Sequence, residues 1–358
     1  MSNTQQQTGW SLFTSSNTPI IDSHIHLWPA SEQESLAFYE PDGPLAGQHS
    51  LDEYLHETSA HRSQLTGFVF VEADRKNDAS KDWTFPLQEI AFAGRITAAG
   101  KDSRSENGGY TPSCLAIIPW APMNLGSEKL EAYLAAAEQE AGPDVWTKVK
   151  GFRYLLQDKP DGTGLTDGFI DCLKLLGRKK FVFDVGVDAR VRKGSQLLEA
   201  VQMVTRAHEG VEEEDKVVFI FNHLLKADLS STNLQDSLFQ GWASCIRELG
   251  KCSHTNMKLS GFFGLIPEDK RIIDDYQTHC QTLSPWFAEV LAAFGSARIM
   301  YGSDWPVCNV GHHGLDSGKA WNKWYGILGQ VCLGTGLSFD DVKRIFGGTA
   351  REAYRIDG

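Results

Sequence analysis

The chain has 358 residues, of which 41% are hydrophobic and 22% charged, a balance typical of a globular protein with a large core. Its net charge of −12 argues against nucleic acid and anionic membranes as partners, because both are bound through basic surfaces. Residues 1–18 are polar and lack a secretory signal, and no apolar run is long enough to span a bilayer. We therefore expect a disordered N-terminal tail over 1–18, a cytoplasmic protein, and seven reduced cysteines.

The first apolar segment, Ile20–Trp28, has the pattern of a strand that ends in a His-x-His motif. Side chains on a strand alternate between its two sides, so His24 and His26 point the same way, toward one ion or one substrate. A pair of hydrogen-bonded histidines lining a pocket is the alternative, and the motif alone does not decide between the two.

Seven further apolar segments follow along the chain, and helical patterns separate them. The expected strands cover residues 67–71, 113–118, 148–154, 181–185, 217–221, 256–261 and 298–301. The expected helices before the C-terminal region cover residues 51–63, 85–97, 127–140, 167–176, 195–209, 238–249 and 285–294.

The alternation of these segments predicts the fold class. Eight strands with helices between them, at intervals of roughly 33 to 48 residues, predict an α/β protein with one (β/α)8 TIM barrel over 19–358. Residues 73–112 form an extended insertion between the second and third strands, and two helices complete the C-terminus. A doubly wound open sheet is the second choice, because no Gly-rich phosphate-binding turn is present.

Polar residues stand at or just beyond the ends of several predicted strands. In a barrel the carboxyl ends of all strands share one face, and active sites lie on that face. We therefore expect one site to contain the strand-end residues His24, His26, Glu72, Arg153, His223 and Asp304.

Metal ligation is one role that these residue types suit. Imidazole binds zinc and manganese alike, so His24 and His26 are candidate ligands of a divalent ion. Glu72 closes an otherwise apolar strand and is a third candidate. Its alternative role is an ion pair with a nearby cation.

Acid–base chemistry is the second role. Asp304 lies in a Gly-Ser-Asp-Trp-Pro turn and is the candidate general base for a water molecule. His223 is a further ligand or an oxyanion donor. Arg153, a permanent donor, is expected to anchor a substrate oxygen, and a salt bridge to Asp184 is its alternative.

Other residues near these motifs receive weaker interpretations. Trp28 and Trp305 are candidates for the pocket wall, with ordinary core packing as the alternative. Lys258 is expected to face the mouth of the barrel, whereas Lys226 and the pair 312–313 receive no role.

Taken together, the motifs resemble the amidohydrolase superfamily. The segments that carry the resemblance are Ile21–Trp28, Val71–Ala73, Lys150–Arg153, Asn222–Leu224, Lys258–Gly261 and Tyr301–Pro306. They are most similar to its lactonase group, whose members open rhamnono- and fuconolactones, and which also includes dicarboxylate and muconolactone hydrolases.

The resemblance implies specific roles for the strand-end residues. It implies a metal set of His24, His26, Glu72 and Asp304, catalytic roles for Asp304, His223 and Arg153, and substrate contacts from Arg153, Trp28, Trp305 and Tyr154. The chain departs from the group at three positions. Asn222 replaces the usual Asp before the histidine, Tyr154 replaces a common His, and Leu225 replaces a Gly.

The expected function is hydrolysis of a small sugar-acid lactone, with L-rhamnono-γ-lactone as the expected substrate. The expected cofactor is a divalent metal ion, zinc or manganese, and a metal-free route stays open. The alternatives are a metal-dependent decarboxylase of an aromatic or unsaturated acid and a non-catalytic, metabolite-binding barrel. The lactone is the only partner expected, with neither nucleic acid nor membrane, and self-association into a homo-oligomer stays open.

Overall fold

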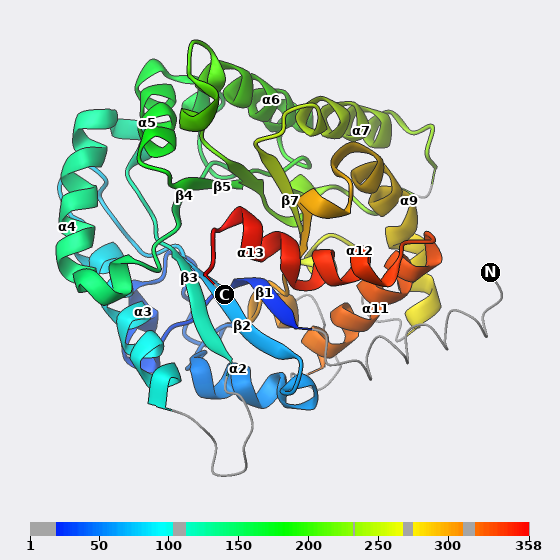
Figure 1. Ribbon diagram of the computed structural model, residues 1–358, viewed down its shortest axis with the longest axis horizontal. Helices are drawn as coiled ribbons and strands as arrows, with labels where there is room; N and C mark the ends of the chain where they lie inside the picture. Colours follow the sequence, from blue (N-terminus) through cyan, green and yellow to red (C-terminus); the bar gives the residue numbers. More distant parts are fainter. Residues whose placement is uncertain (1–18, 103–111, 232, 268–274, 311–318, 358) are drawn as a thin grey trace.

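The computed structural model describes residues 19–102, 112–231, 233–267, 275–310 and 319–357. Eight short parallel strands form its centre (Figure 1). They are β1 (Ile20–Ile25), β2 (Leu65–Val71), β3 (Ser113–Ile118), β4 (Gly151–Leu155), β5 (Val182–Gly186), β6 (Phe219–Phe221), β7 (Thr255–Leu259) and β8 (Ile299–Tyr301). The expected 1–18 tail and the pair 312–313 lie outside the described residues.

The strands follow one another in chain order, as a barrel requires. One ladder joins β1-β2-β3 and a second joins β4-β5-β6-β7-β8, and every pairing is parallel. The two ladders are linked by isolated bridges, Ile117 to Val149 and Trp120 to Arg153 on one side and Ile25 to Trp305 on the other. The predicted α/β fold built on parallel strands is therefore confirmed.

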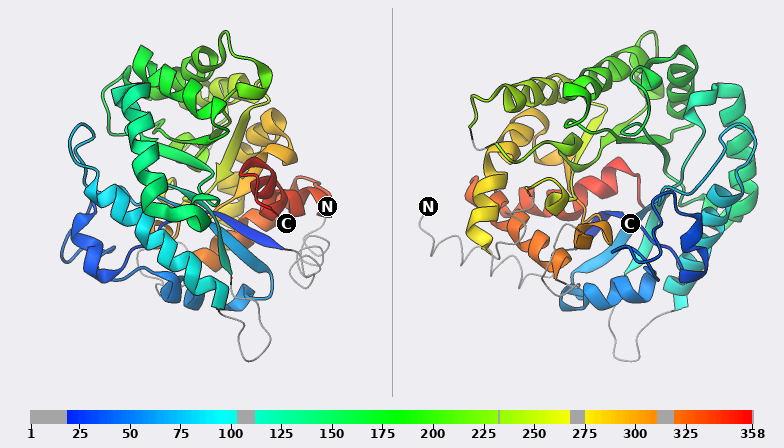
Figure 2. Two further views of the ribbon diagram at one scale, coloured as in Figure 1. Left: turned by 60° about the vertical axis from the view of Figure 1, so that its left-hand side comes forward. Right: turned by 180° about the vertical axis from the view of Figure 1, so that it is seen from behind.

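Helices form an outer layer around the strands, which both views of Figure 2 show. The long helices are α3 (Thr84–Asp102), α4 (Ser127–Trp146), α5 (Asp167–Arg178), α6 (Ser195–His208), α7 (Ser237–Gly250), α9 (Tyr276–Phe294) and α11 (Ala320–Gly334). Shorter ones are α2 (Leu51–Glu57), α10 (Val307–Val310), α12 (Phe339–Lys343) and α13 (Thr349–Ala353). None in the described part of the chain is long and apolar enough to cross a membrane.

Several helix boundaries differ from the prediction: α2 ends at Glu57 and not at 63, and α3 extends to Asp102 and not to 97. One further difference has a clear physical reason. Helix α9 begins at Tyr276 rather than at Pro285, because the Asp275 carboxylate caps it by accepting from the backbone N–H groups of Gln277 and Thr278. Helix α4 continues to Trp146 rather than ending near residue 140, and it has a kink at Gly142, whose φ is 68°.

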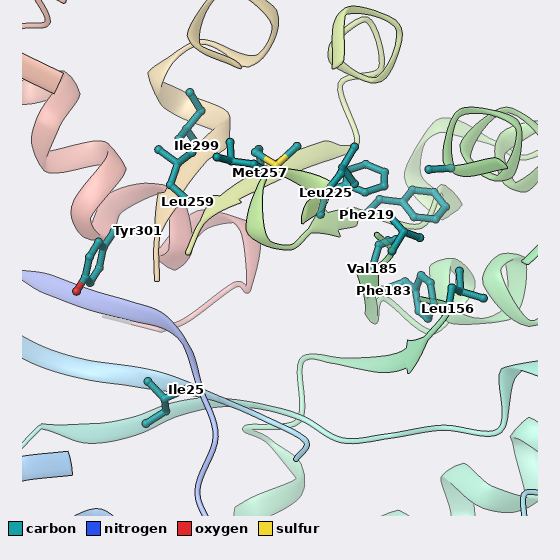
Figure 3. Packing of buried hydrophobic residues seen from close by; sticks show 14 of the residues in the cluster. Ile25, Leu156, Phe183, Val185, Phe219, Leu225, Met257, Leu259, Ile299 and Tyr301 are labelled. Carbon is teal, nitrogen blue, oxygen red and sulfur yellow. The ribbon is translucent and has the colours of Figure 1, made fainter. Parts of the chain in front are cut away.

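Successive side chains on the strands point alternately outward and inward, and they form two separate hydrophobic clusters. Phe183, Val185 and Phe219 point outward, and Figure 3 shows them with Met257 and Leu259 in the packing beneath the helices. A second cluster, made by inward residues of the strands, fills the barrel. Its members include Ile21, Val69, Val182, Ile220 and Met300, together with Ala350, Tyr354 and Ile356 from the C-terminus.

The C-terminal segment closes the end of the barrel where the strands begin. Figure 1 shows α13 lying in front of the strands, and Gly347 lies against the backbone of Pro19, just before β1. Because this end is filled, the polar strand ends on the opposite face form the accessible part of the barrel.

Candidate active site

A cavity of about 390 Å³ opens at the carboxyl ends of the strands. Most of its polar wall comes from the loops that follow the strands, within five residues of the strand ends. The lining includes His26, Trp28, Phe38, Asp74, Arg153, Gln157, Asp158, Arg190, Asn222, His223, Lys226, Gly261 and Asp304.

Three predicted ligands meet at the floor of this cavity. The Nε2 atoms of His24 and His26 are 3.2 Å apart, and they lie 3.6 and 3.4 Å from Oδ1 of Asp304. All three side chains are buried, and in the described residues they alone form a group with metal-ligand spacing. The structure therefore brings together the three residues predicted at the centre of the site, and their roles stay a prediction.

The spacing of the three ligand atoms fits a cation with tetrahedral coordination. Zinc bonds of about 2.0–2.1 Å in tetrahedral geometry place ligand atoms about 3.3–3.4 Å apart. The separations of 3.2 to 3.6 Å bracket this value. His26 is also oriented for ligation, since its Nδ1 lies 3.0 Å from the Val71 carbonyl oxygen and its Nε2 faces the group.

His24 is held from behind by a buried lysine. Nζ of Lys258 lies 3.1 Å from Nδ1 of His24 and 3.0 Å from Oδ1 of Asp184. Tyr354 donates a hydrogen bond to the same carboxylate. Lys258 therefore lies beneath the site and not at the barrel mouth, which corrects the sequence-based interpretation. Burial lowers its pKa to about 8, although Asp184 acts to raise it.

Asp22 joins the first and last strands of the barrel under the site. Its carboxylate is completely buried and accepts from the backbone N–H groups of Ser303 and His24, at 2.8 and 3.3 Å, and from Trp321 at 2.8 Å. The backbone N–H of Asp304 also donates to the His24 carbonyl. These contacts fix the Asp304 backbone with a φ of 66°, a left-handed conformation that is rare for a non-glycine residue.

His223 and Gly261 complete the surroundings of Asp304. Nε2 of His223 lies 3.8 Å from Oδ1 of Asp304, and its Nδ1 lies 2.8 Å from the Ser260 hydroxyl. Gly261 has a φ of 64°, and a Cβ there would lie 2.9 Å from both Asp304 Oδ2 and His223 Nδ1. Only glycine satisfies both the backbone conformation and the close approach.

The segment His223–Lys226 forms one left-handed turn. All four residues have φ between 52° and 56°, although none is glycine. A left-handed conformation costs about 1–2 kcal/mol per residue, and such strain is typical of functional sites. The turn directs both His223 and Lys226 into the cavity. Lys226 is thus a site residue that the sequence-based interpretation missed.

Arg153 and Glu72 form a buried ion pair, with the guanidinium Nε donating to Oε1 at 2.6 Å. Glu72 is therefore not part of the ligand group. It is found in its alternative role, as the partner of a nearby cation. The other expected partner of Arg153 was wrong, because Asp184 binds Lys258 instead. Arg153 does line the cavity, as expected for a substrate anchor.

Of the aromatic residues expected in the pocket wall, only Trp28 lines the cavity. Tyr154 follows the inward-pointing Arg153 on β4, so it points outward and packs edge-on against Phe169. Trp305 is buried, and its indole N–H donates to Glu57 at 3.3 Å. The predicted substrate contacts of Tyr154 and Trp305 are thus not supported.

The protonation states suit base catalysis. Burial alone would raise the pKa of Asp304, but the electrostatic effects of His223, His26 and Lys226 outweigh it and hold the pKa below the usual value. Burial lowers the pKa of His223 to about 3, and burial and Lys258 lower that of His24 well below its usual range. Near neutral pH the site therefore contains an ionised Asp304 beside the neutral imidazoles of His223 and His24.

Comparison with known proteins supports the family resemblance. The model of the amidohydrolase family matches residues 128–356. An L-rhamnono-γ-lactonase of Scheffersomyces stipitis is 30% identical over 349 residues, which cover 94% of this chain and 98% of that protein. An L-fucono-1,5-lactonase of Burkholderia multivorans is 29% identical over 347 residues, with 94% and 96% covered.

Solved structures agree with the fold. A zinc-bound amidohydrolase from Burkholderia multivorans has a TM-score of 0.69 at 23% identity, covering 95% of this chain and 100% of that one. A 2,6-dihydroxybenzoate decarboxylase is more distant, with a TM-score of 0.55 at 13% identity and 95% and 99% covered. The family model, the full-length relatives and the His-x-His and Asp304 floor of the cavity lead to one conclusion: the chain belongs to the amidohydrolase family.

Proposed function

We propose that the protein hydrolyses a sugar-acid lactone by attack of water on the ring carbonyl. The observation that carries the proposal is the ionised Asp304, buried at the floor of the cavity with three imidazoles 3.4 to 3.8 Å from its Oδ1. The full-length relatives named as lactonases support the reaction class.

In this mechanism Asp304 removes a proton from water while the water oxygen bonds to the carbonyl carbon. The carbonyl oxygen becomes an oxyanion. Lys226, His223 and Arg153 all border the cavity as donors, and one such donor is worth about 3–4 kcal/mol to the transition state. Arg153 is paired with Glu72, whereas Lys226 has no carboxylate at ion-pair distance among the described residues, so Lys226 is the strongest of the three.

Ring opening completes the reaction. The bond between the carbonyl carbon and the ring oxygen breaks, and protonated Asp304 gives its proton to the leaving oxygen. The product is an open chain with a free hydroxyl and a carboxylic acid, and the acid then releases its proton to solvent. The proton that reaches the ring oxygen passes through Asp304, whose carboxylate is restored at the end of the cycle.

A divalent ion, if bound, would be held by His24, His26 and Asp304, whose spacing fits zinc. It would polarise the carbonyl and lower the pKa of a bound water toward neutrality. Ligation through Nε2 of His24 would require the ring proton on Nδ1 and therefore an uncharged Lys258 at 3.1 Å, because an ammonium has no acceptor.

L-Rhamnono-γ-lactone is the substrate we propose to test first, because a relative of that specificity spans almost the whole chain. The test measures acid release from a panel of sugar lactones with a pH indicator, before and after treatment with a chelator. Hydrolysis of one lactone supports the proposal. If the chelator abolishes hydrolysis and added zinc or manganese restores it, the ion takes part in the reaction. If hydrolysis is unchanged in protein that elemental analysis shows to be free of metal, the reaction does not need an ion.

Two other outcomes would replace the proposal. Release of carbon dioxide from an aromatic acid, without lactone hydrolysis, would identify a decarboxylase, a chemistry represented among the structurally similar proteins. Binding of lactones without turnover would identify a non-catalytic barrel.

A further inference from the structure

The side chain of Asn222 is buried in the cavity wall without a partner. Asn222 follows β6, is 1% exposed and lines the cavity. Its backbone is fixed, because its N–H donates to Val185 and its carbonyl accepts from Leu225. Neither the Nδ2 nor the Oδ1 atom of its amide has a hydrogen-bond partner among the described residues. Buried polar groups are nearly always paired, so this amide is placed to meet a ligand.

The chemistry of the amide restricts what that ligand group is. An amide presents two N–H donors and one carbonyl acceptor. A carboxylate only accepts, and it would leave the amide oxygen of Asn222 unpaired. A hydroxyl both donates and accepts, so hydroxyl groups on a substrate satisfy both ends of the amide.

The charges around the cavity also favour a neutral ligand. Arg153 is neutralised by Glu72 at 2.6 Å, and Arg190 by Asp188 at 2.7 Å. Lys226 is the remaining cation of the cavity wall, and within the described residues it has no carboxylate at ion-pair distance; it donates to the Gln157 amide oxygen.

Acidic residues outnumber that lysine. Asp74, Asp158 and Asp304 all line the cavity, and none of them is paired with Lys or Arg in the described structure within 4.0 Å. Three carboxyl groups against one ammonium make the cavity unfavourable for a substrate that carries carboxylates. A polyhydroxylated, uncharged ring satisfies the same groups through hydrogen bonds.

From these observations we infer that Asn222 is a specificity-determining residue, which binds ring hydroxyl groups of a neutral polyhydroxylated lactone. The inference rests on the proposed lactone hydrolysis and narrows its substrate class. Asn222 does not act on the reacting bond in this account. It distinguishes hydroxylated lactones from unsubstituted and carboxylated ones.

The test compares two neutral lactones that differ in their hydroxyl groups, L-rhamnono-γ-lactone and γ-butyrolactone. Asn222→Leu removes both hydrogen-bonding ends, and Asn222→Asp keeps the shape but removes the donors. Asn256→Leu, at the opposite end of the barrel on β7, is the matched control. For Asn222→Leu, loss of two hydrogen bonds lowers the ratio of kcat/KM between the hydroxylated and unsubstituted lactones about 10- to 100-fold. Equal losses on both lactones would overturn the inference.

A binding measurement separates this inference from the proposed function. A 1,4-anhydroalditol keeps the ring hydroxyls and lacks the carbonyl, and calorimetry gives its Kd for each variant. We expect Asn222→Leu and Asn222→Asp to raise that Kd about tenfold or more, and Asn256→Leu to leave it unchanged. If the anhydroalditol binds in a way that depends on Asn222 but no lactone is hydrolysed, the proposed function alone is refuted. If lactones are hydrolysed but the Kd of the anhydroalditol is the same in the Asn222 variants, the inference alone is refuted.

Discussion

Replacing Gly261 by alanine tests whether the site depends on the close approach of three elements. The new Cβ would lie 2.9 Å from Asp304 Oδ2 and 2.9 Å from His223 Nδ1, whereas ordinary contact begins near 3.4 Å. Both side chains must therefore move by about half an ångström. Misplacement by about 1 Å costs about 100-fold in rate, so we expect kcat/KM to fall about 10- to 100-fold.

The effect on stability is small by comparison. Alanine at a φ of 64° costs about 1–2 kcal/mol. Unfolding entropy is about 2.1 cal/mol/K per residue, or about 0.75 kcal/mol/K for 358 residues. The strain alone therefore lowers Tm by only about 1–3 °C.

Gly210→Ala is the matched control, because Gly210 has a φ of 67° and no atom within 4 Å of the added Cβ. Thermal unfolding and lactone hydrolysis are measured for both variants. We expect similar losses of Tm, and loss of activity only for Gly261→Ala. Full activity of Gly261→Ala would refute the account of how Asp304 and His223 are placed.

Two further predictions concern charge. In an Asp74→Asn background, which removes the carboxyl whose pKa is raised to about 6 by burial and by Glu72, kcat/KM stays constant from about pH 5 to 7, since His24 and His223 remain neutral and Asp304 ionised. Glu72→Gln leaves the buried Arg153 charge unpaired and lowers the free energy of unfolding by about 3–5 kcal/mol in denaturant titrations.

Each of these predictions has its own control or contrary result. A decline of kcat/KM toward low pH, centred near the ordinary histidine pKa of about 6.5, would contradict the first prediction, because it would show that an imidazole gains a proton in this range and that the reaction is affected. Glu289→Gln, which breaks a partly exposed pair with Arg247, is expected to cost less than about 1 kcal/mol. An equal loss in the free energy of unfolding for the Glu72 and Glu289 variants would contradict the stabilising role of the buried ion pair.

The parts of the fold and site that depend on local pattern were predictable from the sequence. Apolar runs place the strands within a few residues, as for β8, expected at 298–301 and observed at Ile299–Tyr301. The side-chain period of two on a strand brings His24 and His26 to one side. Their meeting with Asp304 then follows from the common face of the strand ends.

The remaining features depend on contacts or backbone angles that no local pattern encodes. Glu72 and Arg153 are 81 residues apart, and Lys258 and Asp184 are 74 apart, so their pairing is a property of the tertiary fold. The left-handed turn that directs Lys226 into the cavity contains no glycine, so its backbone conformation has no sequence signal.

The central claim is that Asp304 is the base of a lactone-opening reaction. The most direct measurement is the rate of acid release from L-rhamnono-γ-lactone by the wild-type protein and by Asp304→Asn. The account predicts a loss of about 1,000-fold in kcat for the variant, with its circular dichroism spectrum unchanged, because asparagine cannot accept the proton. Hydrolysis by Asp304→Asn at the wild-type rate would contradict it.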